Sequence, residues 1–196
     1  ITKSLKLGDI CEIGDGLHGT PQYDENGETY FINGNNIKNG IVRLDENTKR
    51  ISDIEYKKLK LSFGENTLFL SINGTIGNLA IYNNENITLG KSVAYFNIYS
   101  SQLQRKYLFY LLQSAKSQIY FKNSVTGGTI KNLGLKALRE YEVDMPPLAD
   151  QERIVSILDR FDKLCNDLTQ GLPAEIEARK KQYEYYRDKL LSFKHY

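Results

Sequence analysis

The chain changes character once, near Met145-Pro146-Pro147, and this change limits the folds that it can adopt. Before it, short apolar runs rich in Val, Ile, Tyr and Phe alternate with turns that contain Gly and Asn, which is typical of β-strands. After it, apolar residues recur at intervals of three and four residues, which is typical of helices. The sequence therefore predicts an α+β protein with two parts, a mixed, mostly β domain over residues 1–147 and a long helical, coiled-coil-like region over residues 148–196.

The first part contains seven predicted strands and three helical segments. Its turns carry Asn and Gly, which tolerate positive φ and let the chain reverse tightly. These turns are Asn26-Gly27, Asn33-Gly34, Asn39-Gly40, Asn73-Gly74 and Asn83-Asn84. The predicted strands are Leu5–Ile13, Thr29–Ile32, Ile41–Leu44, Thr67–Ile72, Leu79–Tyr82, Val93–Tyr99 and Arg139–Asp144. The predicted helices are Asp53–Leu59 with Ser52 as its cap, a longer one through Leu103–Ile119 capped by Ser100 or Ser101, and a short helix or turn at Leu133–Leu138.

The second part has a narrow apolar seam on each of two charged helical segments. Gly171-Leu172-Pro173 separates the two segments and permits either a tight turn or a kink. Such a seam needs a partner helix, which can come from this chain, from a second copy or from another subunit. The seam residues are Ile154, Ile157, Phe161, Leu164 and Leu168, followed by Ile176, Tyr183, Tyr186, Leu190 and Phe193.

Composition narrows the function classes only a little. The 26 basic and 24 acidic residues leave a net charge of +2, which favours a nucleic-acid partner only weakly. No apolar run approaches the roughly 20 residues of a membrane helix, and no signal peptide opens the chain, so we expect no membrane partner. Cys11 and Cys165 lie far apart without metal-ligand spacing, which predicts reduced thiols in a cytoplasmic protein and no metal site.

Three kinds of catalytic site can be compared with the sequence. A DNA methyltransferase needs an amide and an aromatic ring around its Pro-Pro pair, and Pro146-Pro147 has neither beside it. Asp45, Glu55 and Lys57 fit the spacing of a metal-dependent nuclease loosely, but a solvated helix face explains the last two more simply. A cysteine or histidine hydrolase finds no nucleophile context here. The sequence therefore predicts a protein that is not an enzyme.

Taken in order along the chain, several segments resemble the specificity subunits of type I restriction-modification systems. The most specific of them opens the helical region, as Met145-Pro146-Pro147-Leu148 followed by Gln151-Glu152-Arg153-Ile154. The others are Leu7-Gly8-Asp9-Ile10 with Gly19-Thr20-Pro21, the run from Leu68 to Asn78, Gly127-Gly128-Thr129 with Lys131-Asn132-Leu133, and the stretch from Gly171 to Arg187. Complete subunits of that family have two recognition domains and two spacers, whereas this chain has one of each. We therefore expect half a subunit, either a natural half-length form or, since it begins with Ile1, a piece of a longer protein.

The resemblance implies a subunit that reads one half of a split DNA target and binds no cofactor. Its partners would be double-stranded DNA, the modification subunits that carry out methylation, and a second copy or a different second half. Three loops, over residues 14–20, 90–92 and 122–132, suit this role, because phosphates bind Lys and backbone amides whereas base edges are read by short polar side chains. The candidate DNA-binding residues are His18, Gly19, Thr20, Gln22, Tyr23, Asn35, Asn36, Lys91, Ser92, Lys122, Thr126, Gly127, Gly128, Thr129 and Lys131.

Each of these assignments has an ordinary alternative. The glycine loops can be plain turns, His18 a surface or core histidine, Lys91 a solvated side chain, and Asn35 and Asn36 turn formers. For the whole chain, two other functions stay open: an assembly or decoy module that acts through its helices, and a stand-alone metal-dependent nuclease.

Overall fold

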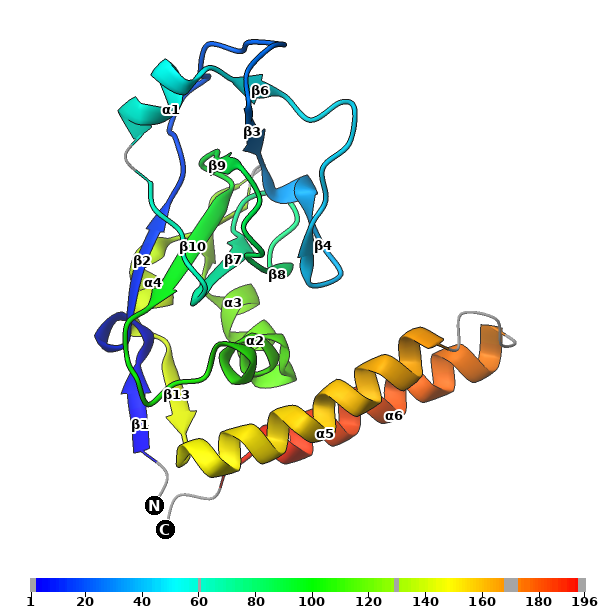
Figure 1. Cartoon of the computed structure of the whole chain (residues 1–196). Helices are drawn as coiled ribbons and strands as arrows, with labels where there is room; N and C mark the ends of the chain where they lie inside the picture. Colours follow the sequence, from blue (N-terminus) through cyan, green and yellow to red (C-terminus); the bar gives the residue numbers. More distant parts are fainter. Residues whose placement is uncertain (1–2, 60, 129–130, 168–172, 194–196) are drawn as a thin grey trace.

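In the computed structural model, which describes residues 3–59, 61–128, 131–167 and 173–193, a four-stranded antiparallel sheet forms the centre of the molecule (Figure 1). Its strand order is β2 (Cys11–Asp15), β10 (Val93–Ile98), β7 (Thr67–Ser71) and β8 (Leu79–Ile81). The last three begin where the sequence predicts them and end one residue earlier. Helices and strands are both present, so the α+β prediction is confirmed.

The main hydrophobic core lies between this sheet and the helices α2 (Arg105–Gln113), α3 (Ala115–Asn123) and α4 (Leu135–Glu140). Phe96 of β10 is fully buried there, and it lies opposite Ile13 of one neighbouring strand and Leu68 of the other. Tyr95, which precedes Phe96 in β10, packs against a second, smaller core on the other face of the sheet. This alternation follows from the strand period of two, which sends successive side chains to opposite faces.

The prediction of a single long helix over residues 103–119 is wrong, because the chain leaves the helical conformation at Ser114 and forms two helices, α2 and α3. Ser114 has extended backbone angles and accepts a hydrogen bond from the Ser117 N–H, so it caps a new helix. Ile119, predicted to be on the buried stripe, is 58% exposed, and Phe121 is buried in its place. Neither Ser100 nor Ser101 caps the first helix, which begins after Gln104.

The strand predicted over Leu5–Ile13 is also divided, because its two halves pair with different partners. β1 (Lys3–Lys6) pairs with β13 (Glu142–Met145), whereas β2 pairs with β10. A turn of 3₁₀-helix, η1 (Leu7–Asp9), joins them. The last strand begins at Glu142 rather than at the predicted Arg139, which lies in α4.

A distal lobe, above the sheet in Figure 1, carries the strands between residues 29 and 51 and the strand β9 (Ile87–Leu89). β3 (Thr29–Ile32) and α1 (Asp53–Leu59) match the prediction, and Ser52 accepts from the Glu55 N–H as the predicted cap. β9, which pairs in parallel with β3, was not predicted, and the strand predicted at Ile41–Leu44 is only two residues long. The other elements are η2 (Gly34–Asn36), β4 (Ile37–Lys38), β5 (Ile41–Val42), β6 (Arg50–Ile51) and β9 (Ile87–Leu89).

The helical region is a hairpin of two antiparallel helices, α5 (Leu148–Asp167) and α6 (Pro173–Leu191), which projects beyond the sheet (Figure 1). Phe161 of α5 stacks on Tyr186 of α6, with ring centroids 5.8 Å apart. Of the two geometries that the sequence allows, a reversal and a kink, the antiparallel direction of α5 and α6 agrees with the reversal, and the partner helix of the seam comes from this chain. Residues 168–172, which include Leu168 and Gly171-Leu172, lie outside the described residues.

The seam is covered unevenly along the hairpin. Near the β domain, Ile154 is buried in the main core and Leu190 packs against it, whereas Leu164 and Tyr186, further out, are 55% and 38% exposed. The helical region therefore shares its core with the β domain at one end and presents apolar side chains at the other. None of the described helices is long and apolar enough to cross a lipid bilayer.

Candidate nucleic-acid interface

The loop over residues 14–20 is held at the end of β2 by backbone hydrogen bonds. The Leu17 N–H donates to the Leu89 carbonyl (2.8 Å), and the Lys91 N–H donates to the Leu17 carbonyl (3.0 Å). Beyond this point His18, Gly19 and Thr20 are exposed. The Nε2 atom of His18 lies 2.6 Å from a carboxylate oxygen of Asp15. The first predicted loop is thus fixed beside the second one, with His18 at its surface.

Gly16 makes this attachment possible, because a Cβ on it would collide with the Leu89 carbonyl. We expect Gly16→Ala to lower the free energy of unfolding by about 1–3 kcal/mol, the usual cost of overpacking a buried position. Gly64→Ala is the matched control, since a Cβ there meets nothing within 4 Å, and we expect a change below about 0.5 kcal/mol. Urea unfolding of both variants measures the difference; equal stability would show that the loop is not anchored at Gly16.

The two predicted residues of the second loop, Lys91 and Ser92, differ in whether their side chains are free to bind a ligand. Ser92 donates to Asn33 Oδ1 (3.0 Å) and accepts from the Gly34 N–H (2.9 Å), so its hydroxyl serves the fold. Lys91 is exposed. Only the lysine of this pair therefore presents its side chain to a ligand.

The third loop is a short hairpin of β11 (Val125–Thr126) and β12 (Asn132–Leu133). The Leu133 N–H donates to the Ile72 carbonyl (2.9 Å), and Asn132 forms a β-bridge with Asn73, which brings this hairpin next to the other two loops. Lys122, Gly127 and Lys131 line a hollow of about 470 Å³. Thr126 and Gly128 are exposed in the same hairpin, and Thr129 lies outside the described residues.

The turn Asn73-Gly74 with Thr75 lies among these loops and is missing from the predicted site. The Asn73 side-chain amide donates to the Lys91 carbonyl (3.2 Å), and Gly74 has a φ of +71° at the rim of the Lys122–Lys131 hollow. The sequence did contain a signal for this turn. If the predicted strands β7 and β10 are taken as neighbours in the sheet, Asn73 and Lys91 lie at the same end of it.

Three predicted residues, Gln22, Tyr23 and Asn36, do not present their side chains on this face. Gln22 and Tyr23 lie in the distal lobe, where Tyr23 bridges to the Ile51 backbone. Asn36 is occupied within the fold, since its Oδ1 accepts from the Asn33 N–H (3.0 Å) and its Nδ2 donates to the Arg43 carbonyl (2.9 Å). Asn35, beside it in η2, is exposed.

The two hollows on the face differ in charge from the one in the distal lobe. The second hollow, of about 400 Å³, is lined by His18, Lys91 and the amides Asn33, Asn73 and Asn132. Of the described residues that line these two hollows, Asp15 alone carries a carboxylate, and it is bonded to His18. The distal hollow is lined by four carboxylates, those of Asp24, Glu25, Asp45 and Glu46, and by two cations, those of Lys49 and Arg50. A polyanion is therefore accommodated better than in the distal lobe on the face formed by the three loops and the Asn73 turn, which we call the loop face.

The residues considered for a nuclease are engaged in local contacts. Glu55 accepts from Lys58 Nζ (2.9 Å), and this hydrogen bond lowers the pKa of the Glu55 carboxyl. Asp45 accepts hydrogen bonds from Asn47 and Thr48 of its own loop. Within the described part of the chain, no cluster of three or more His, Cys, Asp or Glu side chains is placed to hold a metal ion.

Comparison with known proteins gives consistent matches. Residues 2–178 match the family described as "Type I restriction modification DNA specificity domain". A putative type I restriction enzyme specificity subunit of Haemophilus influenzae is 38% identical over 140 residues, covering 71% of this chain and 35% of that protein. The MpnII specificity subunit of Mycoplasma pneumoniae is 30% identical over 193 residues, covering 97% of this chain and 53% of that protein.

A crystallised HsdS subunit from Thermoanaerobacter tengcongensis has the same fold. It superposes with a TM-score of 0.62 over 97% of this chain and 44% of its own length, at 18% sequence identity. The chain thus spans about half or less of this structure and of the H. influenzae relative, and 53% of the M. pneumoniae one.

Proposed function

The chain belongs to the type I restriction-modification DNA specificity family, and from this membership we propose that its loop face reads one half of a bipartite DNA target without catalysing a reaction. The observation that carries the proposal is the meeting of three separate loops and the Asn73 turn on one face that is poor in carboxylates. Loops that converge from distant parts of a chain are typical of binding surfaces on a rigid scaffold.

The side chains on this face suit the two tasks of DNA recognition. Lys91, Lys122 and Lys131 supply the cations that phosphates require. His18 and Asn132 supply short polar groups that can bond to base edges, and an amide is suited to adenine. We propose that the lysines bind the phosphate backbone of the DNA and that these polar residues contact the edges of its bases.

The partners follow from the same proposal. Methylation requires a separate modification subunit that binds S-adenosylmethionine, and this chain itself needs no cofactor. The exposed apolar side chains of the outer hairpin, including Leu164 and Tyr185, offer a surface for a second copy or a different second half. Such an assembly would act on DNA in the cytoplasm.

The first experiment measures binding of the purified chain to duplex DNA as salt is raised. We expect a linear fall of log affinity with log salt concentration, because phosphate contacts release counterions. No measurable salt-dependent binding would favour the alternative of an assembly or decoy module that acts through its helices.

The second experiment maps methylated sites in cells that hold the chain together with a modification subunit. We expect one bipartite motif. A palindromic motif would indicate two identical halves, and a non-palindromic one would indicate a different second domain. Absence of any bipartite motif would contradict the proposed function.

A further inference from the structure

A buried glutamine joins the start of the helical hairpin to the β domain. Gln151, in the first turn of α5, is fully buried. Its Oε1 accepts from the Gln104 N–H (2.9 Å), and its Nε2 donates to the carbonyls of Gln102 (2.7 Å) and Pro146 (2.8 Å). Because a buried amide is costly to leave unpaired, this set of three bonds favours one position of α5 against the start of α2.

A second contact lies two turns further along α5. Asp159 accepts hydrogen bonds from the Tyr110 hydroxyl (2.7 Å) and from Lys106 Nζ (2.6 Å), both on α2. Burial, together with the Asp159 carboxylate, raises the pKa of Tyr110 far above its usual value, so the hydroxyl stays protonated and can donate. This pair fixes α5 along the length of α2 and not at its first turn alone.

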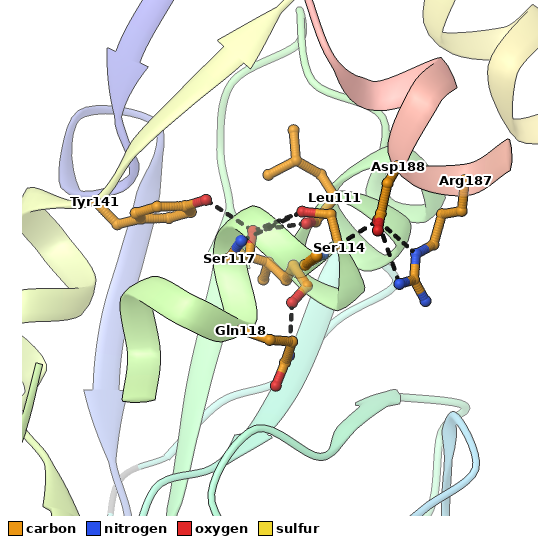
Figure 2. A network of polar contacts seen from close by, with 9 residues as sticks. Leu111, Ser114, Ser117, Gln118, Tyr141, Arg187 and Asp188 are labelled. Atoms are coloured by element: carbon orange, nitrogen blue, oxygen red, sulfur yellow. Dashed lines mark hydrogen bonds and ion pairs between the residues drawn. The ribbon is translucent and has the colours of Figure 1, made fainter. Parts of the chain in front are cut away.

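A third contact comes from the other helix of the hairpin. Asp188 of α6 accepts from the Ala115 N–H (3.1 Å), at the first residue of α3, while Arg187 donates to the same carboxylate (3.3 Å) (Figure 2). The N-terminus of a helix carries unpaired N–H groups and favours a carboxylate. The broken helix at Ser114 therefore exposes a helix start that a residue from the hairpin caps.

The start of α3 is itself fixed to the core, as Figure 2 shows. The Ser117 hydroxyl donates to the Leu111 carbonyl (2.7 Å) and lies 2.8 Å from the Tyr141 hydroxyl, next to β13. Asp188 is thus bonded to a rigid part of the β domain and not to a loose loop.

From these contacts we propose that Gln151, Asp159 and Asp188 form a three-point clamp that holds the hairpin at one angle to the loop face. In the assembled protein this angle would set the distance between the two half-sites. Besides the apolar core that Ile154 and Leu191 share with the β domain, polar contacts run from both helices to three segments (residues 102–104, α2 and the start of α3). A rotation of the hairpin would break at least one of these contacts. The inference rests on the proposed function, and it makes Gln151, Asp159 and Asp188 positioning residues for DNA recognition.

The position of the hairpin relative to the β domain can be measured without DNA, as the distance between two spin labels. One label is placed at Lys57→Cys on α1 and the other at Lys163→Cys on α5, both at exposed positions, with Cys165 replaced by Ser. Burial raises the pKa of the Cys11 thiol to about 12, so this native cysteine stays unlabelled at neutral pH. We expect one narrow distance distribution when the clamp residues are unchanged. In the double variant Gln151→Ala/Asp188→Ala, which we call the clamp variant, we expect a distribution at least twice as wide. Asp188→Asn keeps an acceptor oxygen, so we expect it to retain the narrow distribution.

Glu177→Gln is the control, because Glu177 pairs only with Lys181 on the exposed side of α6 among the contacts described. If the double variant unfolds, Asp188→Ala alone is measured, since its side chain is partly exposed and its loss leaves the core intact. A distribution of unchanged centre and width in a folded clamp variant would overturn the proposal.

The consequence for recognition is tested by methylation of duplexes whose half-sites are one base pair closer or further apart than in the mapped target. We expect the clamp variant to lose at least threefold of its preference for the native gap, while Asp188→Asn and Glu177→Gln keep it. A variant that is merely less stable would slow methylation equally at all gaps, and that result would overturn the positioning role. If the unmodified chain supports no methylation at all, the proposed function fails, and the label distances still decide on the clamp.

Discussion

Replacing Lys91, Lys122 and Lys131 together by Gln is expected to weaken binding to duplex DNA about 100-fold at physiological salt. Each phosphate contact changes the slope of log affinity against log salt by about 0.9, so the loss of three contacts lowers the slope by roughly 2.7. Extrapolated from 1 M salt, where the counterion effect vanishes, to about 0.15 M, that slope corresponds to about two orders of magnitude. All three lysines are exposed, so the variant should fold normally.

The matched control replaces three lysines outside the loop face, Lys57, Lys163 and Lys181, and it lowers the net charge by the same amount. We expect its salt slope to change by less than about 1, because it removes charge without removing phosphate contacts. Fluorescence anisotropy with a labelled duplex at several salt concentrations measures both slopes. Equal losses in the two variants would mean that net charge and not the loop face binds the DNA.

The fold was predictable to the extent that local pattern decides it. The strand at Thr29–Ile32 is a run of β-branched and aromatic residues, the helix at Asp53–Leu59 follows a serine cap, and the structure has both with the predicted bounds. The turn at Asn39-Gly40 has the expected positive φ, 53° and 80°. In each case short-range sterics and capping suffice to select the conformation.

The errors occur where a distant partner decides the local structure. The apolar stripe continues through Ser114 in the sequence, but Ser114 caps a new helix whose first N–H is bonded to Asp188, which is 73 residues further along the chain. The break in Leu5–Ile13 likewise depends on which strand each half pairs with. Single-sequence periodicity carries no information about such pairings.

The candidate site shows the same division. Glycine-rich and lysine-bearing loops were visible as sequence, but their meeting depends on sheet order, which joins Leu17 to Gly90 and Asn73 to Asn132. Asn36 looked available for base contacts, and both ends of its amide are bonded within the fold. Residue type predicts what a side chain can bind; only the packing shows whether it is free to do so.

Replacing Phe96 by Ala is expected to lower the free energy of unfolding by about 3–5 kcal/mol, because it removes a fully buried ring and leaves a cavity. For a chain of this size, each 1 kcal/mol shifts the melting temperature by about 2–4 °C, so a fall of roughly 10 °C is expected. Tyr99, just beyond the same strand, is 63% exposed, and Tyr99→Ala should cost less than about 1 kcal/mol. Thermal unfolding followed by circular dichroism measures both.

The same experiment decides whether the helical hairpin is a separate folding unit. Phe96 lies in one core with Ile154, Leu158 and Leu191 of the hairpin, so loss of the ring should destabilise both parts together. We expect the helical signal of Phe96→Ala to be lost in one transition, at the lowered temperature. If part of the helical signal instead persists to a second, higher transition, residues 148–196 fold independently, and the boundary predicted at residue 147 separates two domains. A single transition would mean that the loop face and the helical hairpin fold as one body, which the proposed fixed distance between half-sites requires.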